Sequence, residues 1–184
     1  MAELRLGSVV SAVLQIELAQ PVDTSDLRRV FGAFPSGVVS VCALVDGEPV
    51  GMVFSSFTSV SLDPPLVSVC AAHSSGTWPT LRGATRLGVS VLGVSHADAA
   101  RKLSSRQGDR FADLEIESSE DGALFLSGAP AWLDCTVETE LHGGDHDVVL
   151  LRVERMATSS DTDPLVFHGS RFHRLDALVS PARG

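Results

Sequence analysis

The chain has 184 residues, of which 44% are apolar and 20% are charged, and its formal net charge is −9. This length and composition predict one globular domain with a sizeable core rather than a disordered chain. The negative charge argues against nucleic acid or anionic membrane as the main partner, because phosphate groups are bound by an excess of lysine and arginine.

The three cysteines, Cys42, Cys70 and Cys135, lie far apart in apolar runs. This spacing fits neither a disulfide framework nor a zinc site, and we interpret them as buried free thiols in a reducing compartment. The apolar stretch near the N-terminus is too short and too interrupted to span a bilayer. We therefore expect a cytoplasmic protein. Its expected parts are an N-terminal extension (1–22), one domain (23–176) and a C-terminal tail (177–184).

The first part of the domain is predicted to alternate helices and strands. N-cap residues at 23–26, followed by apolar residues at helical spacing, predict a helix that ends at Pro35 and Gly37. The β-branched run at 38–45 predicts a strand buried on both faces, and Asp46-Gly47 predicts a hairpin turn. The elements predicted next are strands at 49–54, 66–72 and 86–93 and a short helix at 78–81.

The second part is predicted to be mainly strands. A helix begins at Ser95 and ends by Gly108, and an exposed acidic loop follows to Gly122. Residues 131–141 alternate between apolar and polar, which predicts a half-exposed antiparallel strand. The other predicted strands are 123–126, 146–156, 165–168 and 172–175. Short strands joined by hairpins, with two or three helices outside, predict a mainly β protein built as an antiparallel barrel.

The stretch from Gly51 to Pro65 is the strongest candidate for a ligand site. A short apolar strand leads into Ser55, Ser56, Thr58, Ser59 and Ser61. Short hydroxyl side chains donate and accept hydrogen bonds and let a ligand approach the backbone, which suits an elongated phosphorylated molecule. The chain has neither the glycine-rich turn of a Rossmann fold nor a P-loop, so such a ligand is held in another way.

Several motifs together resemble the flavin reductase-like family, in the order expected for it, over roughly residues 27–175. They are Phe34-Pro35-Ser36-Gly37-Val38, Gly51-Met52, SFTSVSLDPPLV at residues 56–67, Asp109-Arg110-Phe111, Gly144-Asp145-His146 and Phe167-His168-Gly169. The family consists of NAD(P)H:flavin oxidoreductases that supply reduced flavin to two-component monooxygenases. The resemblance implies a homodimeric split β-barrel that binds FMN or FAD near the dimer interface and uses NADH or NADPH.

One segment departs from the family pattern. Val53-Phe54-Ser55 stands where the family often has Thr-Ala-Asn, so Phe54 could narrow the flavin groove or stack on the ring. Two other functions stay open beside the reductase. One is a related flavoprotein that retains its FMN and passes electrons onward, and the other is a ligand-binding or oligomerisation module whose site has decayed.

The resemblance assigns two groups of residues to the flavin. The ring and ribityl chain are expected at Ser36, Gly37, Val38 and the backbone of Val53, Phe54 and Ser55. The ribityl chain and phosphate are expected at Ser56, Ser61, Ser74, Ser75 and Thr77. Arg110 and Phe111 either supply a cation and a stacking face or form a surface loop with one hydrophobic anchor.

The resemblance also places Gly144, Asp145 and His146 at the nicotinamide. We expect His146 to position the nicotinamide rather than to donate a proton, because direct hydride transfer requires no acid. His142, His146 and Asp147 also suggest a metal site. Without a third well-spaced ligand, however, we expect no metal there.

Overall fold

A computed structural model describes residues 18–21, 23–159 and 162–176. The expected N-terminal extension and C-terminal tail fall almost entirely outside these ranges. The helices and strands are α1 (Thr24–Phe31), β1 (Ser36–Gly37), β2 (Val39–Val45), β3 (Glu48–Phe54), β4 (Thr58–Leu62), β5 (Pro65–Ala72), α2 (Trp78–Leu81), β6 (Leu87–Val91), η1 (Val94–His96), α3 (Ala97–Ser104), β7 (Ile116–Ser118), β8 (Ala123–Leu126), β9 (Ala131–Gly143), β10 (His146–Thr158), β11 (Leu165–His168) and β12 (Arg171–Arg174).

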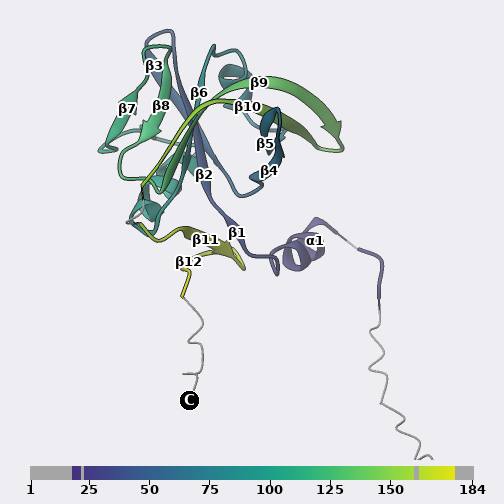
Figure 1. Ribbon diagram of the computed structural model, residues 1–184. Coiled ribbons are helices and arrows are strands. Elements are labelled where there is room, and N and C mark those ends of the chain that lie inside the picture. Colours follow the sequence, from purple (N-terminus) through teal and green to yellow (C-terminus); the bar gives the residue numbers. More distant parts are fainter. Residues whose placement is uncertain (1–17, 22, 160–161, 177–184) are drawn as a thin grey trace, which may run out of the picture.

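The fold is built on one large antiparallel sheet. Its strand order is β4-β5-β10-β9-β6-β2-β8-β7, and β3 pairs with β2 outside this path. The long hairpin of β9 and β10 arches over the body, and the small sheet β1-β11-β12 lies below it (Figure 1). The prediction of a mainly β protein with peripheral helices is confirmed. The sheet curves, but among the described strands no hydrogen-bonded pair joins its two ends, so the barrel is open.

Two clusters of buried apolar side chains hold the sheet together. The larger one is formed by the inner faces of β2, β5, β6, β9 and β10 with Trp78 and Leu81 of α2. The smaller one lies beneath α3 and includes Cys42, Leu103 and Leu124. Aliphatic residues supply most of both clusters, as expected for a chain with no tyrosine. None of the helices in the described ranges has the length and apolar character needed to cross a membrane.

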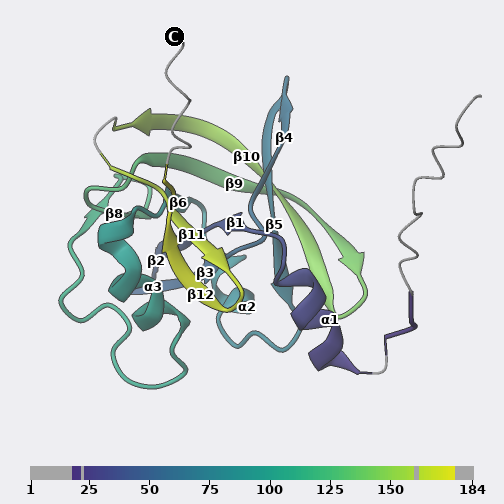
Figure 2. The same ribbon diagram turned by 90° about the horizontal axis from the view of Figure 1, so that it is seen from below.

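Helix α1 confirms the predicted N-cap, but it ends at Phe31, before the predicted stop at Pro35 and Gly37. The carboxylate of Asp23 caps the helix by accepting hydrogen bonds from the N–H groups of Ser25 and Asp26. Its apolar face, however, does not pack into the core, since Val30 and Phe31 are 58% and 67% exposed. The helix lies outside the body beside the β11–β12 hairpin (Figure 2), held by a hydrogen bond from Gly169 N to the carbonyl oxygen of Gly32.

Two strands lie in segments where no strand was predicted. β4 occupies the serine run and pairs with β5, and β7 lies in the acidic stretch and pairs with β8. Both are edge strands whose side chains are mostly exposed. Their sequences therefore carry little of the apolar alternation from which a strand is predicted.

The alternation predicted along β9 fails at both of its ends. Leu141, expected inside, is 54% exposed, and Asp134, expected outside, is 4% exposed. A register shift between Thr139 and Val137 of β9 changes the face on which Leu141 lies. Asp134 keeps its predicted face, and its burial there is tolerated because Arg155 pairs with it at 2.6 Å.

Candidate active site

A cavity of about 290 Å³ opens where β3, the loop after β5 and the end of α3 meet. We call it the serine cavity because hydroxyl groups dominate its polar lining. Its lining residues are Met52, Val53, Ala72, Ser74, Ser75, Gly76, Thr77, Leu103, Ser104, Ser105, Arg106 and Arg110. Segments far apart in sequence thus supply hydroxyls, a glycine and two guanidinium groups to one space.

The loop from Ser74 to Thr77 is held in place by its own hydrogen bonds. The hydroxyl of Ser75 accepts from the N–H groups of Thr77 and Trp78, at 3.3 and 3.1 Å, where α2 begins. The guanidinium of Arg110 reaches back to this loop and donates to the hydroxyl of Thr77 at 2.9 Å. A positive charge is therefore fixed beside a row of hydroxyls, an arrangement that suits a phosphate group.

Five predicted flavin residues line this cavity, and the end of α3 adds three that the sequence analysis missed. The predicted residues are Val53, Ser74, Ser75, Thr77 and Arg110. The missed ones are Ser104, Ser105 and Arg106. Hydroxyls followed by a cation are a signal for an anion site, but these residues lie at and just after the end of α3, where the apolar spacing predicts only a helix.

The first predicted motif lies apart from the cavity lining. Ser36 and Gly37 form β1, which pairs with Phe167 and Val166 of β11. Val38 is buried at 3% exposure in the smaller core cluster. The side chain of Phe54 is also buried, with its ring edge-on to Trp78 at 6.1 Å. Only the backbone of Phe54 is therefore left to face a ligand.

Three of the remaining predicted residues, all serines, lie on or next to the edge strand β4 and not at the cavity. The hydroxyl of Ser56 accepts from the N–H of Cys70 at 2.8 Å, where it extends the β4–β5 pairing. Ser61 lies on β4 opposite Leu66, and Ser55 is exposed just before that strand. These serines lie outside the lining of the cavity.

Phe111 acts as a hydrophobic anchor. Its ring packs over Gly51 so closely that a Cβ built there would lie 2.8 Å from the ring. The same Cβ would lie 2.4 Å from the sulfur of Cys42, so only glycine fits at this position. Phe111 is thus the hydrophobic anchor of the second alternative, and Arg110 lies at the cavity, where the first alternative needs a cation.

The predicted nicotinamide residues lie one strand away from the serine cavity. Gly144 and Asp145 form the turn between β9 and β10, and Gly144 has a φ of 77°. His146 lies directly opposite Ala72 of β5, and Ala72 lines the cavity. Residues directly opposed in an antiparallel pair project to the same face, so His146 lies on the cavity side of the sheet.

His146 is oriented by its neighbour Asp145. Its Nδ1 lies 2.8 Å from the Asp145 carboxylate, and this hydrogen bond is the main cause of the lowered pKa of Asp145. Because an ionised carboxylate only accepts, the Nδ1 of a neutral His146 carries the proton. The Nε2 atom is then an acceptor available to a ligand.

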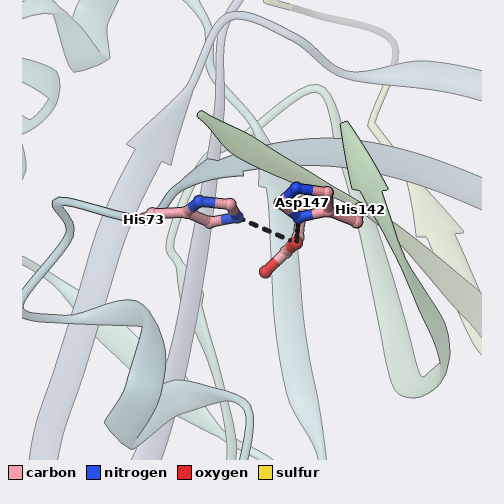
Figure 3. Close-up of side chains that lie close together, drawn as sticks. All are labelled: His73, His142 and Asp147. Atoms are coloured by element: carbon pink, nitrogen blue, oxygen red, sulfur yellow. Dashed lines mark hydrogen bonds and ion pairs between the residues drawn. The ribbon is translucent and has the colours of Figure 1, made fainter. Parts of the chain in front are cut away.

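The residues that suggested a metal site do not all lie together in the structure. His146 is adjacent in sequence to Asp147 and therefore projects to the other face of β10. His73, at the end of β5, takes its place beside His142 and Asp147 (Figure 3). The Nε2 of His73 lies 2.9 Å from Oδ1 of Asp147, and this contact is the first cause of the lowered pKa of Asp147.

Two larger cavities lie elsewhere, of about 370 and 450 Å³. The first is lined by apolar side chains together with Glu117, Asp134 and Arg155, and the second includes Lys102 and Asp113. The cations in both already have carboxylate partners, Asp134 for Arg155 and Asp113 for Lys102. Neither cavity contains a residue that the sequence analysis assigned to a ligand, so the serine cavity is the better candidate.

Comparison with known proteins assigns the chain to a family. Residues 31–176 match the model of the flavin reductase like domain. A flavin reductase of Pseudomonas putida is 34% identical over 80% of this chain and 87% of its own length. The reductase subunit HsaB of a flavin-dependent monooxygenase of Rhodococcus jostii is 32% identical, over 84% of this chain and 79% of its own length.

A solved structure agrees with this assignment. The NADH:FAD oxidoreductase SgcE6 of Streptomyces globisporus, solved with NAD and FAD fragments, has a TM-score of 0.83 and 36% identity. The alignment covers 90% of this chain and all of that one. The motifs, the open antiparallel sheet and these matches lead to one conclusion: the chain belongs to the flavin reductase-like family and is an oxidoreductase of that family.

Proposed function

We propose that this protein takes a hydride from NADH or NADPH, transfers it to FMN or FAD, and supplies the reduced flavin to a separate monooxygenase. The observation that carries the proposal is the serine cavity, with the Arg110 guanidinium fixed on Thr77 and with His146 one strand away. Relatives named as flavin reductases and as reductase subunits of flavin-dependent monooxygenases support it.

The residues of the cavity fit the phosphate and ribityl parts of a flavin. Ser74, Ser75 and Thr77 offer hydroxyls, and Arg110 offers a charge-assisted hydrogen bond to a phosphate. A Cβ added at Gly76 would have nothing within 4 Å, so this point of the wall is open to an incoming group. The bound flavin supplies the electron-accepting ring, and the chain binds and orients it.

His146 acts in this proposal as a positioning group for the nicotinamide. With Nδ1 held by Asp145, its Nε2 can accept a hydrogen bond from the carboxamide of the nicotinamide. NADH and FAD are the pair named for the Streptomyces globisporus relative, and they are the first substrates to test here.

We also propose that the protein is a homodimer that works in the cytoplasm. The exposed apolar residues of the α1 region support the dimer, since Phe31 and Phe34 are 67% and 78% exposed. Two buried thiols, Cys42 and Cys135, fit a reducing compartment. Sedimentation of the untagged protein checks the dimer, and replacing both phenylalanines by serine should shift it to monomer.

The test of the reductase follows the nicotinamide absorbance band anaerobically, with the protein at catalytic concentration and the flavin in excess. Oxidation of many equivalents of NADH per protein chain, together with bleaching of the free flavin, is the expected result. Oxidation limited to one equivalent per chain would instead support the flavoprotein that retains its FMN. Absence of both flavin binding and NADH oxidation would support the decayed module.

A further inference from the structure

We propose that His73, His142 and Asp147 form a binding site for one late first-row divalent cation, with Zn²⁺ as the representative ion. The three residues lie on or next to neighbouring strands, with His73 directly after β5, Asp147 on β10 and His142 on β9. The site does not depend on flavin binding and lies on the face of β10 opposite to His146.

The sheet register brings the three side chains together. Asp147 lies directly opposite His142 on β9 and opposite Ala71 on β5. His73 follows Ala71 by two positions and therefore shares its face. A hydrogen bond from the N–H of His73 to the carbonyl oxygen of Asp145 continues the β5–β10 ladder and fixes the backbone of His73.

The atoms that could bind a metal already converge. One ligand atom from each residue lies within 4.8 Å of the others, and both rings are directed at the Asp147 carboxylate (Figure 3). The rings stack nearly in parallel, with centroids 5.1 Å apart and an interplanar angle of 12°. In a tetrahedral zinc site with ordinary bond lengths, ligand atoms lie roughly 3.4 Å apart. The observed 2.9 Å and 3.6 Å to Oδ1 of Asp147 bracket this separation.

A hydrogen-bonded cluster without a metal explains only part of this arrangement. His73 makes a good hydrogen bond to Asp147, but Nδ1 of His142 lies 3.6 Å from the same oxygen, which is too long for one. Both imidazoles thus point at one oxygen of Asp147, but only His73 forms a hydrogen bond with it. A cation between them would bond to all three residues at once.

The chemistry of the donors selects the type of cation. Two imidazole nitrogens and one carboxylate suit zinc, nickel, cobalt or copper ions, whereas Mg²⁺ and Ca²⁺ prefer oxygen ligands throughout. The side chains of His73 and His142 are 40% and 75% exposed, so an ion can enter from solvent. Glu140 lies on the same face of β9 as His142 and pairs with Arg82 at 2.6 Å. The positive charge of Arg82 is therefore already compensated.

The test titrates the untagged protein with Co²⁺ and follows its visible absorption bands, then displaces Co²⁺ with Zn²⁺. We expect one Co²⁺ per chain, and at least a tenfold loss of affinity in His73→Gln, His142→Gln and Asp147→Asn. His146→Gln should bind as the unaltered protein does, because its ring faces the other side of the sheet.

The chain provides a matched control in a second histidine pair. His168 and His173 lie with ring centroids 5.8 Å apart, and Nε2 of His173 bonds to the carbonyl oxygen of His168 rather than to a carboxylate. His168→Gln and His173→Gln should leave Co²⁺ affinity unchanged. The proposal is overturned if the chain binds no Co²⁺, if the site variants lose less than tenfold, or if the control variants lose as much as the site variants.

Discussion

The two faces of the sheet at the end of β5 carry opposite chemistries within a few residues of each other. On one face, Ala72 and the serines after it line a cavity that holds the guanidinium of Arg110. On the other face, His73 joins a second imidazole and a carboxylate. The first face suits an anion and the second suits a cation. The alternation of a strand is enough to keep two such sites apart without a separate domain for each.

Trp78 contacts residues on both faces. Its replacement therefore tests whether both faces depend on this one side chain for their stability. It is 4% exposed, its N–H bonds to Ser75 of the cavity loop, and its indole N–H donates to Glu140 at 2.8 Å on the other side. Trp78→Ala should lower the free energy of unfolding by about 3–5 kcal/mol, because it leaves a large cavity in the core. Urea unfolding measures the loss.

Trp78→Phe is the conservative control for this change. It keeps an apolar ring but removes the hydrogen bond to Glu140 and part of the buried indole volume, so it should cost about 1–3 kcal/mol, less than Trp78→Ala. A loss below 1 kcal/mol in Trp78→Ala would show that the two faces do not rely on this residue.

Arg110→Gln should damage the anion-binding face alone. A hydrogen bond to a charged group is worth about 1.5–3 kcal/mol, so the KM for FMN or FAD should rise roughly tenfold or more. Riboflavin has no phosphate, so the KM for riboflavin should change by less than about twofold. Steady-state NADH oxidation with each flavin measures both values.

The matched control for Arg110→Gln is Arg101→Gln. Arg101 lies on the exposed side of α3, where it pairs with Asp98. This variant should keep the kinetics of the unaltered protein. Equal losses with FMN and riboflavin in Arg110→Gln would mean that the guanidinium supports the loop rather than a phosphate.

His146→Ala should raise the KM for NADH severalfold and leave the KM for flavin nearly unchanged, because this residue faces the proposed nicotinamide site. Initial rates with each substrate varied in turn give the two constants. His168→Ala, at an exposed position on β11, serves as the control. If both constants rise equally, His146 does not belong to the nicotinamide site.

The smallest expected effect is on the reactivity of two cysteines buried in the core clusters, Cys42 and Cys135. Burial raises the pKa of both the Cys42 and the Cys135 thiol to about 12. Their reactive thiolates are therefore almost absent at pH 8 and form only as the pH approaches 12. Both should resist iodoacetamide in the native protein and react in urea, which peptide mass spectrometry can follow. Alkylation of either residue in the native state would show that the core opens readily.

The sequence was sufficient for most of the regular structure, because the central strands are apolar and their turns are distinctive. Asp46 and Gly47, with φ values of 54° and 83°, form the predicted hairpin turn, and α2 has its predicted bounds. The edge strands β4 and β7 could not be predicted in this way, since few of their side chains are buried. Helical spacing predicted α1 itself, but it could not show that the apolar face is exposed, because spacing does not say what covers a helix.

The candidate site was less predictable than the fold. The hydroxyl loop and Arg110 were identified from motifs, and the structure brings them together across 33 residues. The roles of Phe54, Ser56 and Phe111 depend on what packs around them, which local sequence does not contain. The histidine cluster was missed because its third member, His73, is placed by pairing between β5 and β10, a contact between segments far apart in the chain.

The hydrogen bond between Ser56 and Cys70 makes one backbone amide a reporter for the edge of the sheet. A side-chain hydroxyl, and not a neighbouring strand, protects the Cys70 amide from solvent. Deuterium exchange at that single position therefore measures how often the segment before β4 detaches, while the amides of β10 report on the body of the sheet. Fast exchange at Cys70 with slow exchange in β10 would describe an edge that opens while the rest of the protein stays folded.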